Sequence, residues 1–168
     1  REIDKRALPV LLHPTTPPGA DQLDAGPYQL IGSLGFTFDT ALSVSRMIFD
    51  GFFDRFPNLK LIASHGGGTL PYLAGRLDIC YDRMPSIRTK ISIAPSEYLK
   101  KIYYDAVVYR RDALDLLISV AGIDQIFYGS DYPHNIGDMK GCLARVDSLS
   151  SEQAIAIRGN NAQRVFKI

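Results

Sequence analysis

Two of the three histidines in the chain stand directly after an apolar run. His13 follows the run ALPVLL, and His65 follows the segment LKLIAS. Asp131 stands in a similar place, after the run QIFY and two small residues. Imidazole nitrogens and carboxylate oxygens are the usual protein ligands of zinc and of related divalent metals. These three residues therefore predict a metal site if the fold brings them together.

Each of these residues also has an ordinary structural explanation. A histidine at a strand end is often only a polar cap, and an aspartate before a helix is often an N-cap. The argument for a site is that all three are expected at one edge, because the carboxyl ends of parallel strands open onto the face that carries active sites. His134 is a weaker candidate, since the turn DYPH that contains it could place its ring in solvent.

Three glycines, residues 66–68, follow His65. Glycine lets a backbone turn sharply and lie close to a metal, a water or a substrate. A tight turn between a strand and a helix would explain one or two of these glycines more naturally than three. Their spacing matches neither a phosphate-binding loop nor a dinucleotide fingerprint. We therefore expect a ligand to lie against this backbone.

Arg76 lies eleven residues after His65, inside an expected helix. A guanidinium group can hold a carboxylate through two parallel hydrogen bonds. The ordinary alternative is a solvated arginine on the protein surface.

The elements that must position these residues alternate along the chain. We expect strands over 7–12, 59–64, 102–106 and 125–128, and helices over 37–55, 71–84, 111–121, 139–149 and 151–166, with connections at 15–36 and 85–97. Alternating strands and helices predict an α/β fold with a parallel sheet. Four such units are half of a (β/α)8 TIM barrel, which favours its C-terminal half, strands five to eight. An open, doubly wound sheet is the competing arrangement.

Bulk composition excludes several classes of function. The 168 residues carry a net charge of +1, so nothing recruits nucleic acid or an anionic membrane, and no apolar run approaches the ~20 residues of a membrane span. Two cysteines outside any CxxC pair favour a reducing, cytoplasmic location. The chain begins at Arg1 without a methionine, so we expect one domain, residues 1–168, from the C-terminal part of a longer protein.

Several motifs resemble those of the amidohydrolase-related metal-dependent decarboxylases. They are the apolar strand ending in His13–Pro14, the segment DGFFDRFPNLKLIASHGGG (50–68), PYLAGRLD (71–78) and GSDYPH (129–134). This family has a (β/α)8 barrel and one divalent metal, commonly zinc and in some members manganese. The resemblance implies that His13 and Asp131 bind the metal, that His65 is the catalytic acid/base and that Arg76 binds a substrate carboxylate from the partner subunit of a homodimer. The family's HxH metal ligands are not in this sequence, which implies that the N-terminal half is absent from the chain.

The resemblance implies non-oxidative decarboxylation of a small aromatic or muconate-type carboxylic acid, with His65 moving a proton beside a metal-bound water. The same residues would also suit hydrolysis of a lactone or an amide, and an inactive barrel is the non-enzymatic alternative. Arg76 favours decarboxylation, because it provides for a second carboxylate on the substrate.

Overall fold

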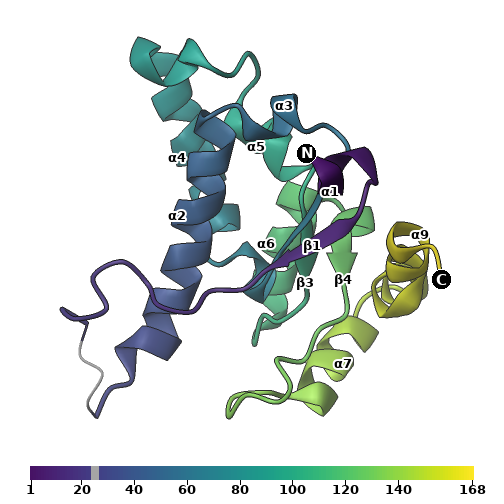
Figure 1. The fold of residues 1–168 in the computed structure, drawn as a ribbon. Helices are drawn as coiled ribbons and strands as arrows, with labels where there is room; N and C mark the ends of the chain where they lie inside the picture. Colours follow the sequence, from purple (N-terminus) through teal and green to yellow (C-terminus); the bar gives the residue numbers. More distant parts are fainter. Residues whose placement is uncertain (24–26) are drawn as a thin grey trace.

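The structure is a computed structural model that describes residues 1–23 and 27–168 (Figure 1). Its strands are β1 (Pro9–Leu12), β2 (Lys60–Ala63), β3 (Tyr103–Asp105) and β4 (Ile126–Phe127). Its α-helices are α1 (Glu2–Lys5), α2 (Phe36–Phe49), α3 (Phe52–Arg55), α4 (Leu70–Arg83), α5 (Pro95–Leu99), α6 (Arg111–Ala121), α7 (Met139–Asp147), α8 (Ser151–Ile155) and α9 (Asn161–Phe166). Shorter π or 3₁₀ turns are η1 (Ile31–Gly35), η2 (His65–Gly67), η3 (Pro85–Thr89), η4 (Ile123–Gln125) and η5 (Ala156–Asn160).

The strands pair in sequence order, β1-β2-β3-β4, and every pairing is parallel. In the register, Leu11 is opposite Ile62 and Ile62 is opposite Tyr103. A doubly wound sheet would reverse its strand order at a switch point, whereas a barrel adds each new strand beside the previous one. The observed order therefore confirms the expected half-barrel topology and excludes the open sheet.

The main hydrophobic core lies between the sheet and helices α2, α4 and α6 (Figure 1). Leu61, Ala63 and Tyr104 point into it, because alternate strand residues face opposite sides. On the other side of the sheet, Val165 of α9 packs on Ile62 and Phe127. Helix α9 does not cover the whole of that side, and Leu11 of the edge strand β1 is 61% exposed. One face of β1 is therefore partly open to solvent in this chain.

The helix expected over 37–55 ends at Phe49, and a separate helix, α3, follows. Gly51 causes this break, because its φ of 67° is left-handed and an added Cβ would lie 2.6 Å from the carbonyl oxygen of Lys90. Helical turns also differ from expectation elsewhere. The connection expected at 85–97 contains η3 and most of α5, and the expected loop at 15–36 ends in η1, while its residues 24–26 lie outside the described residues.

The final expected helix, 151–166, is present as α8, η5 and α9 in direct succession. Ser150 begins it with a capping box: its hydroxyl accepts a hydrogen bond from the Gln153 backbone N–H, and the Gln153 side-chain oxygen accepts one from the Ser150 backbone N–H. None of the helices in the described ranges is long and apolar enough to cross a membrane.

Candidate metal centre

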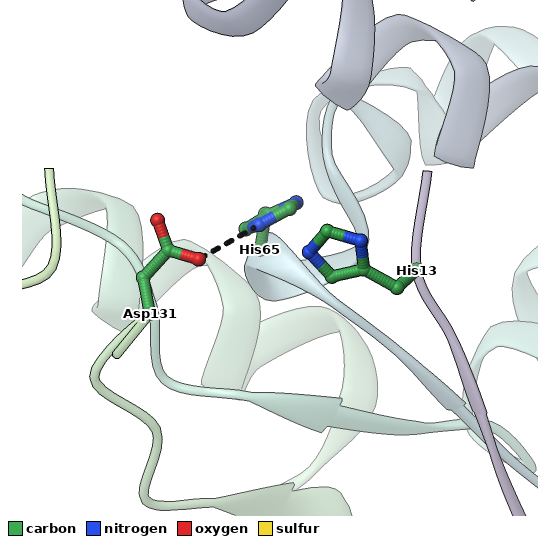
Figure 2. Close-up of side chains that lie close together, drawn as sticks. All are labelled: His13, His65 and Asp131. Atoms are coloured by element: carbon green, nitrogen blue, oxygen red, sulfur yellow. Dashed lines mark hydrogen bonds and ion pairs between the residues drawn. The ribbon is translucent and has the colours of Figure 1, made fainter. Parts of the chain in front are cut away.

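His13, His65 and Asp131 meet at the carboxyl ends of their strands (Figure 2). Each offers one nitrogen or oxygen atom, and these atoms all lie within 4.8 Å of one another. The three residues come from β1, β2 and the segment after β4, which are far apart in the sequence. The parallel sheet thus brings together the set that the strand-end argument selected. Two imidazoles and a carboxylate suit a divalent metal ion.

The His13 ring is held by its own backbone. Its Nδ1 lies 2.8 Å from the carbonyl oxygen of Pro14, so Nδ1 carries the proton and donates to this acceptor. In the neutral ring, the other nitrogen, Nε2, is then the atom that can coordinate a metal. A backbone carbonyl on the second ring nitrogen is the usual way that proteins fix the tautomer and orientation of a metal-binding histidine.

His65 has a left-handed backbone, with a φ of 56°, at the first residue of η2. Its Nε2 lies 3.4 Å from Oδ1 of Asp131. Its Nδ1 is buried and has no hydrogen-bond partner among the described residues. A buried ring nitrogen without a partner is uncommon and calls for a ligand or a transferable proton. The His65 side chain is largely shielded from solvent, with 13% of its surface exposed.

Asp131 also has a left-handed backbone, with a φ of 60°, and its side chain is 7% exposed. The Tyr109 hydroxyl lies 3.5 Å from Asp131 Oδ2 and donates a shorter hydrogen bond, 3.0 Å, to the carbonyl of Ile136. Burial, followed by the negative charge of Asp131, raises the pKa of Tyr109 to about 12. Tyr109 therefore keeps its proton near neutral pH and faces the Asp131 carboxylate as a neutral group.

The three glycines after His65 are explained by contacts within the protein. Their φ values are 60°, 77° and 64°, all left-handed. An added Cβ would lie 2.6 Å from a methyl group of Val108 at Gly66, 2.7 Å from the Tyr104 ring at Gly67 and 2.1 Å from the Thr37 carbonyl oxygen at Gly68. Packing of the turn against β3, the residues after β3 and α2 accounts for all three glycines, so a ligand is not needed to explain them.

The other candidates from the sequence lie outside this cluster. The exposed His134 ring stacks on the His13 ring, with centroids 5.5 Å apart and planes at 10°, yet it is not one of the grouped ligands. Arg76 is exposed on α4 and makes no hydrogen bond or ion pair with any described residue. The structure thus unites His13, His65 and Asp131 and leaves Arg76 at the surface.

One site residue was missed by sequence reasoning. Asp105 ends β3, as His13 and His65 follow β1 and β2, so the strand-end rule would have selected it. Its carboxylate accepts hydrogen bonds from the backbone N–H groups of His65, Gly66 and Val107. Burial raises the pKa of the Asp105 carboxyl, and these three donors counteract part of that effect.

Comparisons with known proteins agree on one protein family. A family model described as amidohydrolase matches residues 1–168. A 2-amino-3-carboxymuconate-6-semialdehyde decarboxylase of Dictyostelium discoideum is 33% identical over 82% of this chain and 38% of its own length. A gamma-resorcylate decarboxylase of Rhizobium is 27% identical over 99% of this chain and 53% of its own length.

Solved structures agree with the fold. The 5-carboxyvanillate decarboxylase of Sphingomonas paucimobilis superposes with a TM-score of 0.84 at 27% identity, over 99% of this chain and 51% of that one. The four parallel strands and their helices therefore correspond to about half of a barrel enzyme. The chain spans roughly 38% to 53% of the length of these relatives.

Proposed function

The chain belongs to the amidohydrolase family, and on this basis we propose that the protein is a metal-dependent, non-oxidative decarboxylase of a small aromatic or muconate-type carboxylic acid. The observation that carries the proposal is the convergence of His13, His65 and Asp131, with ligand atoms within 4.8 Å. The matched relatives named above are decarboxylases, which supports this reaction over lactone or amide hydrolysis.

We assign the metal to His13 and Asp131. The His13 hydrogen bond to Pro14 leaves Nε2 available, and Asp131 offers carboxylate oxygens beside it. Zinc is the first choice for the ion and manganese the alternative, because imidazole suits the former and carboxylate suits both. A bound divalent ion supplies positive charge that lowers the pKa of a coordinated water and attracts substrate oxygens.

His65 is the proposed acid/base. Decarboxylation breaks the bond between a carbon and its carboxylate, and carbon dioxide leaves without the bonding electrons. The carbon that carried the carboxylate must gain a proton. Protonating this carbon first allows the substrate's carbon skeleton to accept the electron pair when carbon dioxide leaves. The His65 imidazole, partly enclosed and 3.4 Å from Asp131, is placed to deliver that proton and to recover one afterwards.

Arg76 is the proposed substrate-carboxylate ligand, supplied by the second subunit of a homodimer. It lies on one helical face of α4 with Tyr72 and Ile79, which are 82% and 50% exposed. An exposed arginine between two exposed apolar side chains suits a protein interface. A partner subunit would bring the guanidinium to the other chain's site.

The two free cysteines support a reducing, cytoplasmic location.

The test uses the full-length protein loaded with zinc or manganese. It is given 2,6-dihydroxybenzoate, a muconate-type acid and a simple lactone, and carbon dioxide release is followed beside lactone opening. We expect metal-dependent carbon dioxide release that a chelator abolishes and added metal restores. Lactone opening without carbon dioxide would replace the proposal with a hydrolase, and a protein that binds neither metal and converts none of these substrates would replace it with an inactive barrel.

A further inference from the structure

The carboxylate of Asp105 accepts three backbone hydrogen bonds at the end of β3. Its Oδ2 accepts from the N–H of His65 at 3.0 Å, and its Oδ1 accepts from the N–H groups of Gly66 at 2.9 Å and Val107 at 3.0 Å. No lysine or arginine of the described residues forms an ion pair with it. A shielded carboxylate is costly without such donors, so these three bonds set where it lies.

Two of the donors belong to residues with unusual backbones. His65 and Gly66 have φ values of 56° and 60°. A left-handed conformation is unfavourable for a residue with a side chain, so something must hold His65 there. Successive N–H groups in such a turn form a concave anion-binding surface. Asp105 supplies the anion from a strand 39 and 40 residues away along the chain.

Asp105 also touches the segment that leads to Asp131. An added Cβ on Gly129 would lie 2.9 Å from the Cβ of Asp105, so the two backbones meet closely there. Asp105 therefore contacts both the turn that carries His65 and the approach to Asp131. Among the described residues, His65 and Asp131 are two of only five non-glycine residues with a positive φ.

We propose that Asp105 is a positioning residue, whose carboxylate holds the main chain of His65 and Gly66 in the left-handed turn that directs the His65 imidazole towards Asp131. The catalytic part of this role rests on the proposed function, while the positioning itself does not. The hydrogen bonds that the Asp105 carboxylate accepts within the described residues all come from backbone N–H groups, so its proposed effect on the reaction is exerted through His65.

Asp105→Asn tests this role with little change of size. An asparagine has one acceptor oxygen, and its NH2 group would face a backbone N–H where a carboxylate oxygen now accepts. At least one of the three bonds is lost. Asp4→Asn is the matched control, because Asp4 Oδ1 also accepts a backbone N–H, from Asn58 at 2.8 Å, at the opposite ends of β1 and β2.

The main measurement is hydrogen–deuterium exchange of individual amides in the full-length protein, beside its thermal unfolding. We expect Asp105→Asn to speed exchange at His65 and Gly66 by at least ~10-fold while distant helices keep their protection. In the active enzyme, kcat should fall about 10- to 100-fold with KM nearly unchanged, as for a misplaced acid/base. Asp4→Asn should change neither the exchange at His65 and Gly66 nor kcat.

Unchanged exchange at His65 and Gly66 in Asp105→Asn would overturn the proposal, and so would faster exchange spread evenly over the chain. If this variant does not fold, the unmodified protein decides: a through-hydrogen-bond NMR coupling between the His65 amide nitrogen and the Asp105 carboxyl carbon supports the proposal, and its absence refutes it. Faster local exchange in a protein that releases no carbon dioxide would leave the positioning role standing and refute the decarboxylase assignment alone.

Discussion

Nε2 of His65 lies 3.4 Å from Oδ1 of Asp131, across 66 residues of sequence. Both residues have left-handed backbones, and both side chains are largely shielded from solvent. Backbone strain of this kind persists only where surrounding structure imposes it, and it concentrates at functional sites. In the proposed mechanism this pair joins the proton carrier, His65, to a metal ligand, Asp131, and variants of the site histidines can separate the two roles.

Replacing His65 by alanine should remove proton transfer and leave the metal in place. An acid/base group typically contributes ~10²–10⁴-fold to a rate, so carbon dioxide release should fall by that factor. Metal content, measured by mass spectrometry, should remain close to that of the unmodified protein. A variant that loses the metal as well would make His65 a ligand, and near-normal turnover would make it a structural strand-end residue.

His13→Ala should abolish tight metal binding, because its Nε2 is a proposed ligand atom. His134→Ala is the matched control, since its ring stacks on His13 at 5.5 Å but lies outside the ligand group. We expect metal affinity to fall in the first variant by more than the ~10- to 100-fold that the loss of an outer-shell partner costs, and to change little in the second. Equal metal loss in both variants would show that His134 shares the site.

The strand-end rule was sufficient to predict where His13, His65 and Asp131 meet, because parallel strands place their carboxyl ends at one edge. Four strand–helix units likewise predicted the half-barrel. What sequence patterns could not predict were contacts between distant segments. The packing of residues 66–68 against Val108, Tyr104 and Thr37 depends on three-dimensional proximity, so the glycines seemed to need a ligand.

A second kind of error came from giving periodicity too much weight. The apolar spacing from Phe38 to Phe52 is helical throughout, yet Gly51 ends the helix with a left-handed backbone. The motif at residues 50–68, which suggested the family, also has a structural role. Its Asp54 accepts a 2.5 Å hydrogen bond from the Tyr98 hydroxyl. Residues of a family motif can therefore serve packing as well as chemistry.

Gly68→Ala should destabilise the fold by more than ~2 kcal/mol, because φ is 64° and the new Cβ would lie 2.1 Å from a backbone oxygen. Gly75→Ala is the control: this glycine is inside α4 with nothing within 4 Å, so alanine should stabilise the helix by about 0.5–1 kcal/mol. Chemical denaturation of both variants measures the difference. A Gly68→Ala variant as stable as the unmodified protein would contradict the packing explanation.

Asp50 gives a pH-dependent contribution to stability. Its hydrogen bonds to Lys90 and Arg55 lower its pKa from 3.8 to about 2. The unfolded chain then binds the proton first as pH falls, so the contribution is complete above the ordinary pKa and is lost between about pH 4 and pH 2. Asp50→Asn should lower Tm near pH 7 by no more than ~4 °C, since the pairs are exposed. This difference should shrink towards pH 2, and a constant difference would refute the assignment.

Arg76 should act in the site of the other subunit, which subunit mixing can show. Arg76→Ala alone should raise KM for a dicarboxylic substrate with metal content intact, because Arg76 lies on the exposed face of α4, outside the metal cluster. When Arg76→Ala and His65→Ala proteins are unfolded together and refolded, a mixed dimer contains one site with both His65 and the partner's Arg76. Activity should then return to a fraction of the unmodified value, whereas each variant refolded alone stays low. No recovery in a mixture that sedimentation shows to be dimeric would place Arg76 in its own subunit's site or on the plain surface.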